Sequence, residues 1–218
     1  MKRVFDFICS LVALIILSPV LLIISLLIVI DSPGGVFFRG ERVGQYGKSF
    51  RIFKFRSMIP DCEGKGTWNI SDHDDRITKM GHFLRKSKLD ELPQLLNVLK
   101  GDMSLVGPRP ELRYYIDMYT EREMPILSMK PGITDWASMT NFEQVKGFTA
   151  AADPDRYYLE QIRPLKLELQ LYYYHHRSIW ADLTCLFWTV YKVLTHSQKL
   201  PREVQNIVDA YQKEKVSV

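Results

Sequence analysis

The sequence is poor in the residues that build disulfides and transition-metal sites. Its three cysteines, Cys9, Cys62 and Cys185, are odd in number and far apart, which excludes a disulfide framework and a zinc site built on paired cysteines. Of its five histidines only His175 and His176 are neighbours, and adjacent side chains on a helix point in different directions, so a shared metal is not expected. A reducing location that faces the cytosol fits this composition.

The excess of one charge over the other is small. The net charge is +4 and charged residues make up 25% of the 218 residues, which excludes global disorder. The mild basic excess favours anionic partners, such as nucleotides, lipid phosphates, nucleic acid or an acidic membrane face. The length suits one compact domain plus a membrane element.

Charge is absent altogether from one segment, Phe7 to Ile30. As a helix this run would be about 36 Å long, and the hydrocarbon core of a bilayer is about 30 Å thick. The run is too long for the core of a signal peptide, and no cleavage site with small residues follows it. Its composition alone favours a single-pass anchor.

Two features favour a helix that bends and returns to the same membrane face. Pro19 has no amide proton and crowds the carbonyl of Ile15, which predicts a bend at Ser18-Pro19, with the Ser18 hydroxyl bonded back to the Leu14 carbonyl. The flanks on both sides are basic, which draws both ends towards the cytoplasm. We therefore predict a re-entrant helix over residues 1–31 with two arms of about 18 Å each. The flanking basic residues are Lys2, Arg3, Arg39, Arg42, Lys48 and Arg51.

The region after the apolar run predicts a small β-hairpin and a loop. Val36–Phe38 and Phe50–Phe55 are rich in aromatic and β-branched residues, which predicts a strand pair. Lys54 and Arg56 alternate with aromatic residues there, so they form either a cationic binding face or a merely solvated one. The polar loop over residues 61–75 contains Asp72-His73-Asp74, which looks like the metal-binding DxD of nucleotide-sugar glycosyltransferases, and residues 77–86 are expected to be helical.

The segment Leu89–Pro110 concentrates the groups suited to chemistry on a phosphate. Leucines at helical spacing predict a helix over Asp90–Lys100, with Asp90 as its N-cap. A helix N-terminus attracts phosphate, and Arg85, Lys88 and Arg109 add cationic donors around it. Arg109 lies between two prolines, so it loses little entropy on binding. The alternative is that Asp90 only caps the helix, Glu91 is a solvated acid and Arg109 pairs with Glu111.

These pieces resemble the bacterial sugar transferases, small monotopic phosphoglycosyl transferases that start glycan assembly on a polyprenyl phosphate. The resemblance is close from residue 2 to about residue 137 and looser at Tyr172–Leu194. The matching pieces follow the family order: Lys2-Arg3 with Phe5-Asp6, Ser18-Pro19, Asp31-Ser32-Pro33-Gly34 with Val36-Phe37-Phe38, Glu41-Arg42-Val43-Gly44, Lys54-Phe55-Arg56-Ser57-Met58, Arg76-Ile77-Thr78, Leu89–Pro110, Pro131-Gly132-Ile133-Thr134 and Trp180-Ala181-Asp182-Leu183.

The resemblance implies a two-step covalent mechanism with Mg²⁺. Asp90 would attack the β-phosphate of a UDP-sugar and release UMP, and polyprenyl phosphate, most simply undecaprenyl phosphate, would then take the phosphosugar from Asp90. Glu91 would help Asp90 hold the Mg²⁺ ion or assist the second attack. The side chains expected to bind the substrate phosphates are basic: Arg85, Arg109, Lys54 and Arg56.

The expected fold is α+β and mostly helical. A catalytic domain over residues 32–195 would face the cytoplasm at the bacterial inner membrane, followed by a polar tail over 196–218. The expected partners are a UDP-sugar, polyprenyl phosphate and the membrane, with no nucleic acid, and a homo-oligomer is compatible with them. Ile179–Leu194 predicts an amphipathic helix with aromatic residues, which lies either in the bilayer interface or on the domain core.

The chain departs from the family pattern at three places. The family usually continues Pro-Gly-Ile-Thr with Gly-Trp-Ala-Gln, whereas this chain places Asp135 and Ser138 at the first and last of these positions. We expect the recognition of nucleotide or sugar in this loop to differ. Lys88 stands where a small polar residue is usual and adds positive charge two residues before Asp90.

Two other functions are compatible with the sequence. A glycosyltransferase that uses Asp72 and Asp74 to act directly on a lipid acceptor would release UDP instead of UMP. A non-enzymatic scaffold in a glycan-assembly complex would tolerate Asp90→Asn. Pathways for capsule, O-antigen, exopolysaccharide and glycoprotein all fit the pattern.

Overall fold

The computed structural model describes residues 2–60, 74–140, 154–195 and 197–216. Within these ranges helices predominate and the strands pair into two-stranded sheets, which confirms the expected α+β class. The helices are α1 (Lys2–Asp31), α2 (Lys79–Ser87), α3 (Gln94–Lys100), α4 (Arg113–Ile116), α6 (Pro154–Tyr157), α7 (Arg163–His176), α8 (Ile179–Thr195) and α9 (Arg202–Val216). The strands are β1 (Phe37–Phe38), β2 (Glu41–Val43), β3 (Ser49–Arg51), β4 (Lys54–Phe55), β5 (Ser104–Val106) and β6 (Gly132–Thr134).

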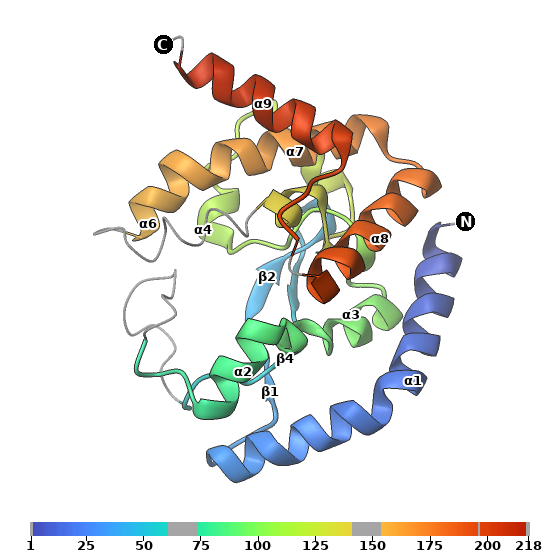
Figure 1. Cartoon of the computed structure of the whole chain (residues 1–218), viewed down its shortest axis with the longest axis vertical. Coiled ribbons are helices and arrows are strands. Elements are labelled where there is room, and N and C mark those ends of the chain that lie inside the picture. The colour runs from blue at the N-terminus through green and yellow to red at the C-terminus, as the bar shows by residue number, and fades with distance from the viewer. Residues whose placement is uncertain (1, 61–73, 141–153, 196, 217–218) are drawn as a thin grey trace.

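Helix α1 runs along one side of the molecule and bends near its middle (Figure 1). Its most apolar stretch has a mean hydropathy of 3.2, so by length and composition it could cross a membrane. Pro19 lies inside the helix, and the Ser18 hydroxyl donates to the Ile15 carbonyl at 2.8 Å, not to Leu14 as the sequence suggested. Ile15 carries the carbonyl that Pro19 leaves without an amide donor, so Ser18 takes the place of the missing bond.

The N-terminal arm of α1 is held to the folded domain by polar contacts. Arg3 donates to the carbonyl of Leu99 at 2.8 Å, at the C-terminal end of α3, where carbonyls have no helical partner. Asp6 is buried and accepts a hydrogen bond of 2.8 Å from the Ser104 hydroxyl of β5.

The C-terminal arm of α1 is held to the same domain. The Arg56 guanidinium donates to the carbonyls of Ser32 and Ile28 at 2.8 and 3.4 Å. The Asp31 carboxylate accepts the backbone amide of Met80, in α2, at 2.9 Å. Both ends of α1 are therefore fixed to one body, and the apolar side chains between them face outwards. The most exposed of these are Ile15, Ile16, Leu22, Ile23, Leu26 and Ile30.

The strands confirm the predicted hairpin region. β2 pairs antiparallel with β3 across a short turn, and β1 pairs antiparallel with β4, so that Phe38 lies opposite Lys54. β5 and β6 are parallel, with Val106 opposite Thr134. α2 confirms the helix expected near 77–86; its Leu84 is fully buried, whereas Phe83 is 55% exposed.

The C-terminal region packs more fully than the sequence suggested. A π-helical turn over Tyr158–Ile162 leads into α7, and Pro164 lies in the first turn of α7, where a proline is tolerated. α9 lies against α7 (Figure 1) and buries Val204 completely, so much of the predicted polar tail is a docked helix. α8 buries Cys185 and turns apolar side chains outwards. The exposed apolar residues of α8 are Ile179, Trp180, Leu183, Phe187, Val190, Val193 and Leu194.

Candidate active site

Asp90 and Glu91 lie in a separate 3₁₀ turn, Leu89–Glu91, between α2 and α3. Lys88 adopts a left-handed conformation (φ 59°) that ends α2 and reverses the chain into this turn. The N-cap of α3 is Pro93, so the prediction that Asp90 caps the helix is wrong. The backbone N–H of Leu92 donates to the carbonyl of Leu89 and so completes this turn before α3 begins. Both carboxylates therefore lie on the turn and not on α3.

Lys54 is the cationic partner of Asp90. Lys54 is the first residue of β4, and its ammonium nitrogen lies 2.7 Å from Asp90 Oδ2 and 3.5 Å from Glu91 Oε1. Asp90 is only 3% exposed, so the Lys54 charge offsets much of the cost of burying this carboxylate. The sequence named both residues, and the structure brings them together.

The Arg109 guanidinium forms an ion pair with the Glu91 carboxylate. Nη1 donates to Glu91 Oε2 at 3.1 Å and Nη2 donates to Glu91 Oε1, a bidentate pair. Burial raises the pKa of Glu91, but the charges of Arg109 and Lys54 outweigh it and hold that pKa well below its usual range. The Glu91 charge in turn raises the pKa of Arg109. The alternative pairing of Arg109 with Glu111 is therefore wrong.

Glu111 has a structural partner of its own behind the Pro-Arg-Pro segment. It forms a buried ion pair with Lys166 of α7 and accepts a hydrogen bond of 2.9 Å from the Tyr158 hydroxyl. Its backbone carbonyl accepts the amide of Val43 at 2.9 Å. These contacts fasten the segment to α7 and to β2.

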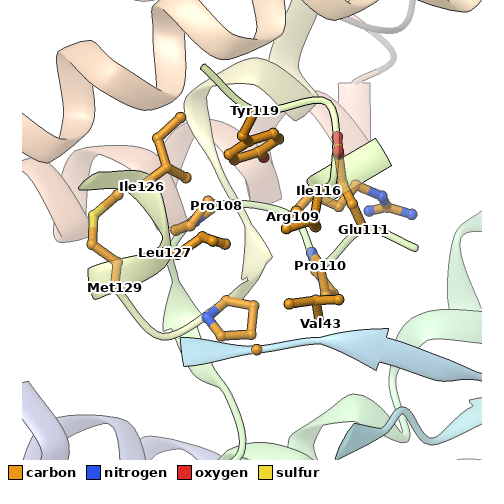
Figure 2. Close-up of a pocket in the computed structure, with 12 residues that line it drawn as sticks. Val43, Pro108, Arg109, Pro110, Glu111, Ile116, Tyr119, Ile126, Leu127 and Met129 are labelled. Carbon is orange, nitrogen blue, oxygen red and sulfur yellow. The ribbon is translucent and has the colours of Figure 1, made fainter. Parts of the chain in front are cut away.

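A small cavity lies behind this segment (Figure 2). Its volume is about 20 Å³, which is room for one water molecule and far too little for a sugar nucleotide. This cavity, whose lining includes neither Asp90 nor Glu91, is therefore not the binding site of a sugar nucleotide. The side chains that Figure 2 labels around the cavity are Val43, Pro108, Arg109, Pro110, Glu111, Ile116, Tyr119, Ile126, Leu127 and Met129.

Asn97 links the strand that carries Lys54 to the helix that follows Asp90. Its fully buried amide accepts the backbone N–H of Phe53 at 2.7 Å and donates to the carbonyl of Arg51 at 2.9 Å. Asn97 was not among the predicted site residues. The spacing of Leu92, Leu95, Leu96 and Leu99 places it on the other side of the predicted helix, so no local pattern indicated that it would be buried.

The two remaining basic residues of the predicted set lie elsewhere. The Arg56 guanidinium is buried against the carbonyls at the end of α1, which gives it a structural role, and its role as a phosphate contact stays a prediction. Arg85 lies in the last turn of α2 and, in the part of the chain that the structure describes, forms no ion pair with Asp90 or Glu91. Its role in binding phosphate stays a prediction.

Only the last residue of the DxD-like triplet can be placed. Asp72 and His73 lie outside the described residues. Asp74 pairs with the guanidinium of Arg76 at 2.5 Å, and this hydrogen bond, working against burial, lowers the pKa of Asp74 to about 2. The carboxylate is thus already engaged, and no observation favours the DxD alternative.

The paired carboxylates supply oxygen donors of the kind that Mg²⁺ prefers. Among the described residues no cluster of three or more His, Cys, Asp or Glu side chains could hold a metal by itself. Mg²⁺ commonly binds one or two carboxylates and completes its shell with substrate phosphates and water. Asp90 and Glu91 fit that mode and would need the phosphates of a donor to complete it.

Several known proteins are similar to this chain over most of its length. A UDP-N-acetylgalactosamine-undecaprenyl-phosphate N-acetylgalactosaminephosphotransferase of Aeromonas hydrophila is 40% identical over 198 residues, which cover 89% of this chain and 44% of that protein. A UDP-glucose:undecaprenyl-phosphate glucose-1-phosphate transferase of Escherichia coli (strain K12) is 39% identical over 195 residues, 88% of this chain and 40% of that protein. The uncharacterized sugar transferase EpsL of Bacillus subtilis (strain 168) is 39% identical over 194 residues, 89% of this chain and 87% of that protein.

The chain thus spans less than half the length of the first two relatives and most of the third. The family described as bacterial sugar transferase matches residues 1–196, which include all of the side chains discussed above at the site. On this match the chain belongs to the bacterial sugar transferase family.

Proposed function

We propose that this protein transfers a phosphosugar from a UDP-sugar to polyprenyl phosphate, most simply undecaprenyl phosphate, and releases UMP. The observation that carries the proposal is the buried Asp90 carboxylate, 2.7 Å from the Lys54 ammonium and next to the Glu91–Arg109 pair. A carboxylate nucleophile beside fixed cations suits phosphoryl transfer, because the cations stabilise charge that develops on the phosphate. Relatives named as transferases that act on undecaprenyl phosphate support the same reaction class.

In the first step an oxygen of Asp90 attacks the β-phosphorus of the donor. A phosphorus–oxygen bond forms to Asp90 as the bond from the β-phosphorus to the bridging oxygen breaks, and UMP leaves with that electron pair. The product is an acyl phosphate that carries the sugar. Arg109 and Lys54 lie where they can neutralise the phosphoryl oxygens, while Glu91 orients the Arg109 guanidinium.

In the second step a phosphate oxygen of the lipid attacks the same phosphorus. The bond to Asp90 breaks, the carboxylate is regenerated, and the product is a polyprenyl-diphosphate sugar. The charge that Asp90 regains is again compensated by Lys54, so one ion pair serves both steps. Such a product would begin the assembly of a bacterial glycan.

Asp90 and Glu91 are the residues that would hold Mg²⁺ together with the donor diphosphate. A bound Mg²⁺ ion would withdraw charge from the phosphate oxygens and so make the phosphorus easier to attack. Lys54 already bonds to Asp90 Oδ2, and Arg109 bonds to both carboxylate oxygens of Glu91. The two side chains would share these oxygens with the ion.

We further propose that α1 enters the cytoplasmic face of the bacterial inner membrane and returns to it. A single-pass helix would separate its two ends by the thickness of a bilayer, whereas Arg3 and Arg56 tie opposite ends of α1 to one domain. The bend at Pro19 and the outward apolar side chains fit a re-entrant helix. The exposed apolar and aromatic face of α8 suits the bilayer interface better than the domain core.

Release of UMP tests the proposed reaction directly. Purified protein with undecaprenyl phosphate, Mg²⁺ and a panel of UDP-sugars should yield UMP with at least one donor. The isosteric variant Asp90→Asn should lose this activity, because an amide cannot serve as the nucleophile. Release of UDP instead of UMP, or full activity of Asp90→Asn, would contradict the proposal.

A further inference from the structure

Asp135 lies directly behind Arg109, in the segment that follows β6. Its side chain is 2% exposed, and its Oδ2 accepts the backbone N–H of Arg109 at 3.2 Å. The same oxygen accepts Nε2 of Gln170, on α7, at 3.1 Å. One buried carboxylate thus connects the Pro-Arg-Pro segment to α7.

The bond to Arg109 uses the one backbone donor that the Pro-Arg-Pro segment offers. Pro108 and Pro110 have no amide proton, so Arg109 N–H is the sole backbone donor of residues 108–110. On the acceptor side, the carbonyl of Pro108 receives the Gly132 N–H at 3.0 Å. Residues 132–135 therefore hold the backbone of this segment by a donor and an acceptor close to Arg109.

The close approach at this point leaves no room for adjustment. A Cβ atom added to Gly132 would lie 2.1 Å from the backbone nitrogen of Gly107, and one added to Gly107 would lie 2.3 Å from the carbonyl oxygen of Lys130. Because the two backbones are in direct contact, a change in the 132–135 segment is passed to Arg109 without intervening flexible side chains.

The other oxygen of Asp135 fixes the carboxylate itself. Oδ1 accepts the backbone N–H of Ser138 at 2.7 Å and also the Ser138 hydroxyl, as an N-cap does for the helical residues 136–140. The two positions at which this loop departs from the usual family pattern are therefore bonded to each other. The bonds from Ser138 hold the Asp135 carboxylate in the orientation in which its Oδ2 faces the backbone N–H of Arg109.

A capping role alone does not account for the contact with Arg109. A buried negative charge close to a site for a diphosphate opposes the binding of that anion. An uncharged acceptor such as serine or threonine could cap the helix without this cost. The bonds to Arg109 and Gln170 are what a carboxylate adds, since it accepts several donors at once.

We propose that Asp135 is a positioning residue for Arg109, which sets the place of the guanidinium that receives the donor phosphate. The proposal rests on the function proposed above and adds to it how the phosphate-binding arginine is held. Loss of the carboxylate lets the Arg109 backbone shift, and misplacement of a binding group by about 1 Å costs up to 100-fold in rate.

A double-mutant cycle with Arg109→Lys tests the coupling, with kcat/KM for the preferred UDP-sugar as the measurement. Asp135→Ala should lower kcat/KM by about 10-fold to 100-fold, mainly through KM for the donor. Lysine has no planar fork to orient, so in the Arg109→Lys background the same change should cost less than about 3-fold. An equal loss in both backgrounds, or no loss in the first, would overturn the proposal.

Three controls separate positioning from folding and from the reaction itself. Ser178→Ala removes a comparable cap, the 3.1 Å bond from Ala181 N–H in α8, and should lower the melting temperature without changing kcat/KM. If Asp135→Ala does not fold, the isosteric Asp135→Asn replaces it in the cycle, and the same two results support or overturn the proposal. Activity of Asp90→Asn would count against the proposed function. If Asp90→Asn is inactive but the effects of Asp135→Ala and Arg109→Lys on kcat/KM are additive, only the positioning role of Asp135 is contradicted.

Discussion

Replacing Arg56 by methionine tests what fastens the C-terminal end of α1 to the domain. The buried guanidinium donates to the carbonyls of Ser32 at 2.8 Å, Ile28 at 3.4 Å and Pro33. A hydrogen bond from a charged group contributes about 1.5–3 kcal/mol, and the bond to Ile28 is long, so after the cost of burying the charge we expect a loss of roughly 3 kcal/mol. For a chain of this length that corresponds to a fall in melting temperature of about 6–12 °C.

The assay compares the melting temperature in detergent with KM for the UDP-sugar at a temperature where the variant is folded. Arg56→Met should melt earlier and keep its KM, because the side chain does not reach the carboxylates. Arg109→Met, at the site itself, should raise KM, and it should also lower the melting temperature because it leaves the Glu91 charge without its bidentate partner. If Arg56→Met kept the melting temperature of the unmodified protein but raised KM, Arg56 would be a phosphate contact after all and the structural role would be refuted.

The remaining predictions concern strain, pH and the membrane surface. Lys88→Gly should raise the melting temperature, because glycine accepts the left-handed conformation (φ 59°) that costs other residues about 1 kcal/mol; a lower value would contradict this. The folded-state pKa of Glu91 is lowered, so its stabilising effect is complete above pH about 4.5 and is lost as the pH falls. The difference in melting temperature between the unmodified protein and Glu91→Gln should therefore stay constant from pH 8 to 5 and shrink below pH 4.5, and a change between pH 5 and 8 would speak against the Arg109 pairing. Phe187→Glu, on the exposed face of α8, should weaken sedimentation with anionic liposomes while leaving the melting temperature within about 2 °C; unchanged sedimentation would argue against an interfacial α8.

Elements with a strong local cause could be predicted from the sequence. The bend of α1 follows from Pro19, whose missing amide proton interrupts the helical ladder wherever the helix lies. The paired strands follow from aromatic and β-branched runs separated by glycines, as at Phe37 and Phe55. The resemblance named Lys54, Asp90, Glu91 and Arg109 as site residues, and the structure brings them together. The ion pairs that join them were not predicted.

The errors arose where tertiary contacts override a local pattern. Alternation along the strand placed Lys54 and Arg56 on one face, but β4 ends at Phe55, and the Arg56 side chain turns to the unpaired carbonyls at the end of α1. Asp90 looks like a helix cap in the sequence, but the left-handed Lys88 inserts a separate turn before α3.

The C-terminal helix was missed although its signal was present. Val204 and Val208 of α9 are buried, and Ile207 and Tyr211 pack against the same core. These four residues recur at helical spacing on one face, a pattern that indicates an amphipathic helix and not a frayed tail. The partners of Asp135 were hidden, because the residues that it joins, Arg109 and Gln170, are far apart in the sequence.

The central claim is that Asp90 becomes covalently linked to the phosphosugar during turnover. Mass spectrometry of the purified protein, mixed with the UDP-sugar and Mg²⁺ but without polyprenyl phosphate, tests it most directly. The account predicts an added mass of one sugar phosphate, located by peptide analysis at Asp90 and removed when polyprenyl phosphate is supplied. Steady formation of the lipid-linked product without any such adduct, together with normal turnover of Asp90→Asn, would contradict it.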